Sequence, residues 1–356
     1  MSIPIYSPMQ KSKPGESIAL IKLASTLHGN VIPFFDALAL KPGTENGQDV
    51  EVHFSKQAIN IAAAGNAIGT CYVDLLDVDP NARGIGGVHP VKSIFEKLEF
   101  ERITLIPVVG LERDVAYKLA IRNIIAKGVN ALAIRLLADD LSLPSSLFEK
   151  VKRLISEVGA HDLPIHVFMD FRSIEHISSD LVQLLVQRAL PEIRKLTPGR
   201  IVFCASSMLT DMSKVKKNVL KAVPRRDLMI WENLYQNNPD LDYGDYGIVQ
   251  PGYADFDKNI KPAAKIRYTC NNEWIIAKGT RWISDTSQHK DLAKLIVKSD
   301  QFRGPDCWGG ESITIASNGG QSPRILQRWV SIDQNNHITH TIQQLARIGQ
   351  TTPQFA

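Results

Sequence analysis

The sequence predicts an α/β fold, a TIM-type (β/α)8 barrel with a long insertion after its eighth strand and a C-terminal extension. Two observations support this prediction. Short apolar runs alternate with amphipathic helical patterns seven times across the first 230 residues, and such alternation is typical of a closed parallel barrel. The runs are also continuously apolar, as expected for strands that are covered on both faces.

The predicted strands are short segments rich in Val, Ile, Leu or Phe. They cover Pro4–Met9, Val31–Asp36, Cys71–Asp77, Arg102–Val109, Ala131–Leu137, Ile165–Phe171, Ile201–Ser206 and Leu228–Asn233. The predicted helices between them cover Gly15–Leu27, Phe54–Ala64, Val91–Leu98, Asp114–Ala126, Ser145–Val158, Leu181–Leu196 and Met212–Val223. Because βαβ crossovers are right-handed, these repeats coil in one sense and can close.

The regular alternation ends after Asn233. Residues 234–287 lack a long amphipathic helix and contain a predicted hairpin, Lys265–Cys270 with Trp274–Lys278. The next helical pattern, His289–Lys298, is a candidate for the eighth barrel helix. The insertion of roughly fifty residues is far longer than an ordinary loop. We therefore expect a barrel over residues 1–300, with a lid-like insertion at about 234–287, and an extension over 301–356 that packs on it.

Composition and charge restrict the class of protein. The formal net charge is +4 with interspersed acids, whereas nucleic-acid binders usually carry a denser basic stripe, so nucleic-acid binding stays open. Four widely spaced cysteines without a CxxC pair indicate a reducing compartment and argue against a zinc site. No apolar run reaches the length of a membrane span, and the N-terminus lacks a signal-peptide pattern. These features predict a cytoplasmic protein that does not enter a membrane.

Charged residues inside the predicted strands point to the barrel's interior. Side chains alternate along a strand, so Asp170 and Arg172 in strand six lie opposite the apolar residues that must meet the helices. Arg135 shares its face with Ala131 and Ala133, whose small side chains leave room for it. Further polar residues stand near the C-terminal ends of strands one, two, three, seven and eight: Lys11, Lys13, Glu16, Asp36, Asp74 (or Asp77), Ser206 and Glu232.

Two interpretations of these charges remain open. Buried charges need partners, so they can form an ion network that only completes the core. Alternatively they form an active or ligand-binding site, which their position at the C-terminal strand ends favours. In that case Asp170 or Glu232 would act as acid or base, and Arg135, Arg172 and Lys11 would hold an anionic group. The many acids could also hold Mg²⁺, although no HExxH motif is present.

Aromatic residues are concentrated in the insertion. They are Tyr243, Tyr246, Tyr253, Tyr268, Trp274 and Trp282. Such rings could stack on a base or line a partner groove, or they could pack the insertion onto the barrel. Packing is the slightly favoured interpretation.

Several sequence blocks resemble one known family. They are Pro8–Glu16, Ile32–Asp36, Gly244–Pro251, Ile266–Thr269 with Glu273-Trp274 and Lys278-Gly279, and Trp329 with Asn336–His340. Together they resemble the Beta protein family, which is named for a protein of a satellite phage and also occurs in bacterial genomes. Members often carry Glu where this chain has Asp36. The Gly-Asp-Tyr and Asn-His-Ile-Thr-His blocks are the most distinctive.

The resemblance implies a role in anti-phage defence. Family members occur in phage-encoded and bacterial anti-phage cassettes, where the Beta protein sits beside a host-killing protein whose toxicity it restrains. It therefore implies a toxic protein of the same cassette as partner, with a third small protein as a further candidate. It also supports Lys11 and Glu16 as ligand-binding candidates. The further candidates that it implies are Asp245, Gln250, Arg267, His337 and His340. We expect these residues to converge with the strand-end charges in one site.

The competing hypothesis is a barrel hydrolase that acts on a phosphorylated or nucleotide-like substrate. It predicts a pocket at the strand ends, whereas the defence hypothesis predicts a stable complex with a neighbouring gene product. A structural scaffold is a third possibility, and whether the chain is an enzyme stays open at this stage.

Overall fold

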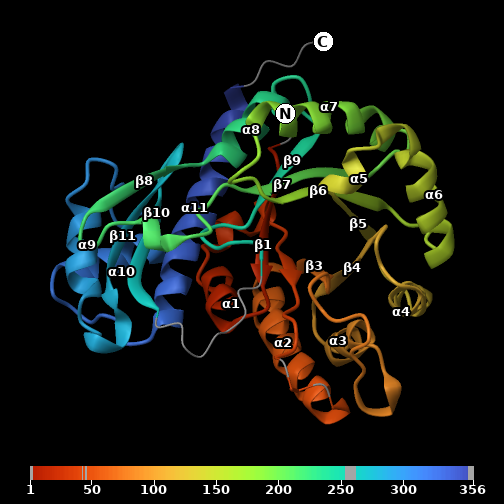
Figure 1. Ribbon diagram of the computed structural model, residues 1–356, viewed down its shortest axis with the longest axis horizontal. Helices are drawn as coiled ribbons and strands as arrows, with labels where there is room; N and C mark the ends of the chain where they lie inside the picture. Colours follow the sequence, from red (N-terminus) through yellow and green to blue (C-terminus); the bar gives the residue numbers. More distant parts are fainter. Residues whose placement is uncertain (1–2, 42, 45, 253–261, 352–356) are drawn as a thin grey trace.

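The computed structural model describes residues 3–41, 43–44, 46–252 and 262–351. Within these residues eight parallel strands close into a barrel, in which β9 pairs with both β7 and β1 (Figure 1). The strands are β1 (Tyr6–Lys11), β2 (Phe34–Asp36), β3 (Thr70–Asp74), β4 (Thr104–Gly110), β5 (Leu132–Leu137), β6 (Ile165–Ser173), β7 (Arg200–Ser206) and β9 (Leu241–Asp245). The predicted barrel is confirmed, and so are its first seven strands.

Helices surround the barrel and begin at identifiable caps. Those of the barrel wall are α1 (Pro14–Ile21), α2 (Gly47–Ile68), α3 (Pro90–Leu98), α4 (Val115–Ala126), α6 (Leu147–Val158), α7 (Ser179–Arg194), α8 (Arg226–Tyr235) and α11 (Leu326–Thr351), with α5 (Ala138–Leu141) as a short turn before α6. Asn46, Asp114 and Ser178 accept backbone N–H groups at the starts of α2, α4 and α7, as N-cap residues do. Gly159 ends α6 in the left-handed conformation.

The predicted eighth strand is wrong. Leu228–Asn233 lies within α8, and the eighth strand is β9 instead. The buried residues Leu228, Trp231 and Tyr235 recur at helical spacing, which a short apolar run cannot distinguish from a strand. The predicted helix Met212–Val223 is also wrong, because it contains one 3-10 turn and then β8 (Leu220–Pro224).

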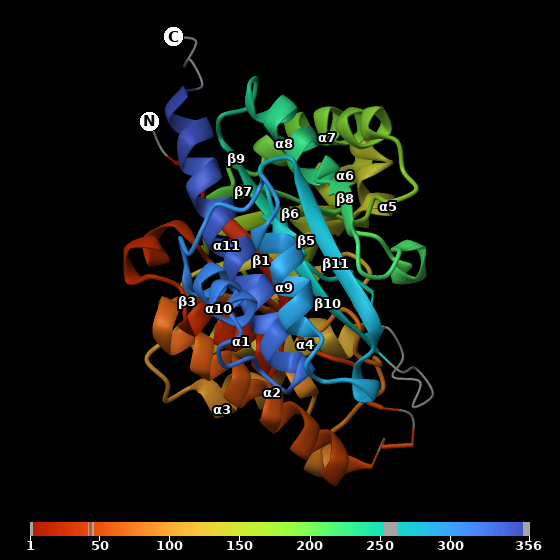
Figure 2. The same cartoon turned by 90° about the vertical axis from the view of Figure 1, so that its left-hand side faces the viewer.

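A small antiparallel sheet lies beside the barrel. It consists of β10 (Ala263–Thr269), β11 (Glu273–Arg281) and β8, in the order β10-β11-β8, so the predicted hairpin is confirmed. Helices α9 (His289–Val297) and α10 (Trp308–Ser317) share an apolar core with this sheet. Figure 2 shows α9, α10 and α11 on this side of the molecule.

The eighth position in the barrel wall is occupied by α11, and not by the predicted helix at His289–Lys298. Ile338, Ile342 and Leu345 of α11 belong to the core between strands and helices, whereas α9 packs on the small sheet. Helix α11 therefore separates the small sheet from the barrel (Figure 1). It lies within the predicted extension 301–356, and it completes the barrel wall.

The barrel's interior is polar at both ends and apolar in the middle. Near the N-terminal strand ends, Arg200 donates to Asp242 (2.7 Å) and to the Tyr72 hydroxyl (2.7 Å). An apolar layer that includes Phe34 and Phe168 follows. The alternation predicted for strand six is confirmed, because Phe168 faces this interior while Val167, Met169 and Phe171 belong to the outer core.

The aromatic residues of the insertion mainly serve packing. The side chains of Tyr243, Tyr246, Tyr268 and Trp274 are fully buried. Trp282 is half-buried against His289, and Tyr253 lies outside the described residues.

Candidate functional site

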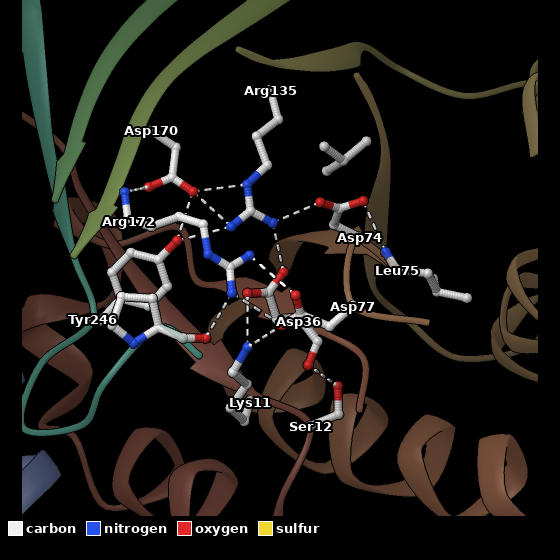
Figure 3. A network of polar contacts seen from close by, with 12 residues as sticks. Lys11, Ser12, Asp36, Asp74, Leu75, Asp77, Arg135, Asp170, Arg172 and Tyr246 are labelled. Carbon is white, nitrogen blue, oxygen red and sulfur yellow. Dashed lines mark hydrogen bonds and ion pairs between the residues drawn. The ribbon is translucent and has the colours of Figure 1, made fainter. Parts of the chain in front are cut away.

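Arg135 is the centre of a polar cluster at the C-terminal ends of the barrel strands (Figure 3). Its side chain is fully buried. Its Nη1 donates to Asp36 and Asp74, both at 2.7 Å. Its Nε and Nη2 donate to Asp170 at 2.9 and 2.6 Å, and Nη2 also donates to the Tyr246 hydroxyl at 2.8 Å. One guanidinium therefore joins strands β2, β3, β5 and β6.

Three further cations extend this cluster. Arg113 donates to both carboxylate oxygens of Asp74 at 2.7 and 2.8 Å. The Nζ of Lys11 lies 3.1 Å from Asp36 and 3.0 Å from Asp77, and Arg172 pairs with Asp77 at 3.1 Å. We call these residues the mouth network; they are Lys11, Asp36, Asp74, Asp77, Arg113, Arg135, Asp170, Arg172 and Tyr246. Four carboxylates face four cations in it, so its formal charge is zero. At its edge Arg113 also pairs with Glu112, whose side chain is 36% exposed, at 2.8 Å.

Electrostatics keeps the centre of the mouth network ionised. Burial alone would raise the pKa of Asp36, but Arg135 and Lys11 outweigh it and lower that pKa well below its ordinary value. Burial alone would lower the pKa of Arg135, but Asp36 and the other acids raise it. Burial, with the charge of Asp170, also holds the pKa of the Tyr246 hydroxyl well above its ordinary value. Asp36 and Arg135 therefore form an ion pair that is stable at neutral pH.

Asp170 has little capacity left for acid-base chemistry. Its Oδ2 accepts from Arg135 and from the Tyr246 hydroxyl at 2.6 Å. Its Oδ1 accepts from the backbone N–H of Arg172 at 2.8 Å. Its side chain is also fully buried, so this carboxylate serves the network and is not presented to a substrate at the mouth.

The outer part of the network is more open. The side chains of Arg172 and Asp77 are 26% and 20% exposed, compared with 0% for Arg135. Arg172 has a φ of 51° where β6 shifts register against β7, a conformation that is costly for residues other than glycine. Its Nη2 donates to the Pro251 carbonyl at 3.1 Å, which holds the segment after β9 at the mouth.

A second cluster lies between β1, β9 and α11, on the outer face of the barrel. Here Asp245 accepts from the Tyr6 hydroxyl at 2.5 Å and lies 2.9 Å from Nε2 of His337. The Nε1–H of Trp274 points at Nδ1 of His337 at 3.4 Å. Since an indole nitrogen only donates, Nδ1 accepts, and Nε2 carries the proton that faces Asp245. We call this group, with Tyr243 and Asp227, the wall network.

The wall network contains two carboxylates whose pKa values are shifted in opposite directions. Burial raises the pKa of Asp245, but His337 and Arg225 outweigh burial and lower it well below its usual range. Burial and the charge of Asp245 raise the pKa of Asp227. The Tyr243 hydroxyl lies 2.6 Å from Asp227 and 3.0 Å from Asp245. These contacts attach α11 and the small sheet to the barrel.

A third polar group lies between α1, β10 and α11. Arg267 donates from its backbone N and its Nε to Asp333, both at 3.1 Å. Burial raises the pKa of Glu16 to about 7, and burial likewise raises the pKa of Asp333 to about 7. Within the described part of the chain, Oε2 of Glu16 and Oδ1 of Asp333 have no hydrogen-bond partner.

The remaining predicted residues lie apart from the mouth network. Lys13 is exposed at the N-cap of α1, and Nε2 of Gln250 donates to the Met208 carbonyl. His340 is buried, which lowers its pKa to about 2. Glu232 is half-buried on α8 and does not stand at a strand end. The expected single site is therefore three separate groups, because Asp245 and His337 face the helices and not the barrel's interior.

Several participants were not predicted as site residues; they include Arg113, Asp333, Tyr246, Tyr6 and Asp227. Tyr246 and Gly244 alternate with Asp245 along β9, so a correct assignment of this strand would have placed Tyr246 inside the barrel. The strand is hard to recognise, because Asp242 and Gly244 interrupt its apolar pattern. Asp227 lies on α8, one residue before the segment that the sequence predicts as a strand.

The described residues offer no group of three or more His, Cys, Asp or Glu side chains that could hold a metal ion. At the mouth the guanidinium of Arg135 stands between the carboxylates of Asp36, Asp74 and Asp170. A cation already occupies the place that Mg²⁺ would need, so the donor set does not fit this metal.

Comparison with known families decides the relationship of the chain. The family model described as Beta protein matches residues 6–343. The chain belongs to the Beta protein family. No curated protein matches it. Among solved structures, a thermostable mutant of a xylanase (Xyn10A) from Cellvibrio japonicus matches at 10% identity over 77% of this chain and 92% of that one, with a TM-score of 0.32.

For this Beta protein, the assignment of a TIM-type barrel depends on its own strand order, because a TM-score of 0.32 is too low to support a shared fold. Among the helices of the described residues, none combines the length and apolar character needed to cross a membrane.

Proposed function

We propose that this Beta protein is a cytoplasmic component of an anti-phage defence module that binds and restrains a toxic protein of the same cassette. The observation that supports a non-catalytic role, and so favours binding over turnover, is the neutral mouth network. Its four carboxylates are paired with four cations, and its central members are buried. A barrel mouth arranged in this way is a rigid structural core.

The hydrolase alternative has less support. It needs a carboxylate that exchanges a proton with substrate within hydrogen-bond reach. Asp170 is engaged on both oxygens, and Glu232 lies on α8 away from the strand ends. The cations that would hold a phosphoryl group are likewise occupied by aspartates.

Co-expression tests the binding role. The chain, carrying an affinity tag, is expressed with its toxic cassette neighbour, with and without the third small protein. We expect the neighbour to co-purify as a complex of fixed stoichiometry and cell growth to be restored. Identification of the bound protein by mass spectrometry ensures that the complex contains the cassette product.

A variant separates binding from hydrolysis in the same experiment. Glu232→Gln removes the second predicted acid without touching the mouth network. We expect it to restrain the neighbour as well as the wild type does. A tagged chain that restores growth while it remains a lone monomer would contradict the binding role, and loss of restraint in Glu232→Gln would favour the hydrolase.

A further inference from the structure

A groove on the small-sheet side of the molecule is not used by any of the three polar groups. It runs between α10, the loop that follows it and the first turns of α11, with Lys290 of α9 at its edge. Its cavity volume is about 1120 Å³, slightly above the range of about 300–1,000 Å³ for pockets that bind small ligands. The groove is therefore large enough for several residues of an extended segment.

The groove combines positive charge with apolar surface. Lys290, Arg324 and Arg328 line it, and its lining contains no acid. The guanidinium of Arg328 lies over the Trp308 ring at 5.1 Å. Beside them, Ile315 is 45% exposed. Within the described residues neither arginine forms an ion pair with a carboxylate, in contrast to each cation of the mouth network.

The walls of the groove are fixed by local structure. Helix α10 ends with N–H bonds from Gly319 to the Ala316 carbonyl and from Gly320 to the Ile315 carbonyl, as in a Schellman motif, and Gly319 has a φ of 80°. The Nε1–H of Trp329 donates to the Pro323 carbonyl at 3.1 Å. The side-chain oxygen of Ser322, which also lines the groove, is buried and has no partner in the described chain.

We propose that this groove binds an acidic segment of the toxic partner, with carboxylates facing Arg324 and Arg328 and an apolar side chain next to Trp308. This inference rests on the proposed function. Complementary charge favours such a segment, because cations without carboxylate partners attract acids and reject basic segments. Proteins that bind nucleic acids usually carry an extended basic stripe. The three cations of this short groove do not form such a stripe, so an acidic protein segment fits it better.

The test compares two double variants in the full-length chain. Arg324→Glu with Arg328→Glu reverses the groove's charge, and Lys216→Glu with Lys217→Glu makes the same change at exposed residues outside it. We expect the groove variant to bind the purified partner at least about tenfold more weakly, because like charges in contact repel. We expect the control to bind within twofold of the wild type. Circular dichroism shows whether both variants are folded.

Cross-linking identifies the occupant. A photo-crosslinking amino acid replaces Ile325, which is 66% exposed beside Arg324, or Phe100, which is 92% exposed at the far end of α3. We expect Ile325 alone to link to the partner, within a segment in which Asp and Glu outnumber Lys and Arg.

The outcomes separate this inference from the proposed function. A partner that binds the groove variant as tightly as the wild type, and that links elsewhere, overturns the groove and leaves the binding role intact. A wild-type chain that forms no complex overturns both. Binding of a labelled single-stranded RNA that is lost only in the groove variant would also overturn the acidic segment as the occupant.

Discussion

Replacing Arg135 by Met tests the mouth network quantitatively. The substitution keeps a long side chain in place and removes the charge that three aspartates share. Because the network is neutral, the variant holds one uncompensated negative charge in a buried site. Removing one partner of a buried ion pair costs about 3–5 kcal/mol.

Protonation of one aspartate limits the loss of unfolding free energy in the variant. Uptake of one proton restores neutrality, and protonating an aspartate of ordinary pKa near 3.9 costs about 4 kcal/mol at pH 7 but only about 1.5 kcal/mol at pH 5. We therefore expect the free energy of unfolding of the variant to be about 4 kcal/mol below that of the wild type at pH 7. At pH 5 the difference should shrink by about 2 to 3 kcal/mol, to about 1.5 kcal/mol. Such a loss is a large fraction of the stability of a typical domain.

Urea denaturation followed by circular dichroism measures both values. The control is Arg194→Met, which breaks an exposed pair with Asp240 at 2.7 Å and should cost no more than about 1 kcal/mol. The reasoning is refuted if the two variants lose similar stability, or if the loss in Arg135→Met is the same at pH 5 and pH 7.

Three further perturbations test other parts of the structure. Gly244→Ala should destabilise the barrel by about 1–3 kcal/mol, because a Cβ there would lie 2.5 Å from the Cys204 sulfur; Gly29→Ala, with open space around it, is the thermal-unfolding control. Glu16→Gln should flatten the pH dependence of the free energy of unfolding. The pKa of Glu16 is near 7 in the folded state and near 4.3 in the unfolded state, so the wild type loses stability as pH rises between these values. An unchanged slope of unfolding free energy against pH would contradict this. His337→Phe should cost about 1–3 kcal/mol in urea, since the buried Asp245 loses the hydrogen bond that His337 donates; an unchanged free energy of unfolding would contradict the wall network.

The barrel could be predicted because its first seven strands are short, mainly apolar runs that alternate with helical patterns. Alternation alone also placed Arg135, Asp170 and Arg172 at the inside of the barrel. There Arg135 donates to Asp74 and pairs with Asp170, and Arg172 donates to Asp77. These placements used only the two-residue period of a strand. They needed no knowledge of which strands are neighbours.

The end of the barrel could not be predicted because its pattern is ambiguous. The run at Leu228–Asn233 is too short to distinguish helix from strand by periodicity, whereas the true strand β9 contains Asp242 and Gly244. Because of this error Glu232, which lies on α8, was predicted at a strand end. For the same reason Tyr246, which follows β9, was not predicted inside the barrel. The position of α11 depends on tertiary packing, since its apolar residues complete the wall from almost one hundred residues beyond β9.

The residues suggested by family resemblance illustrate a different difficulty. Asp245, His337 and Arg267 are buried and form hydrogen bonds, but they join elements of the fold instead of lining the mouth. A polar residue that recurs in a distinctive block is as compatible with a buried structural bond as with a ligand contact. Only the direction of the side chain distinguishes a structural bond from a ligand contact. For Asp245 that direction follows from its position on β9, which was not predicted as a strand.

The most direct test of the binding role is the stoichiometry of restraint. The toxic partner is expressed at a fixed level while the amount of this chain is raised, and growth is recorded against the molar ratio of the two proteins, measured by quantitative mass spectrometry. A binding protein must match its target, so we expect growth to recover in proportion and to reach its maximum near equimolar amounts. Full recovery at about one-tenth of an equivalent would show turnover, as expected of an enzyme, and would contradict the binding role.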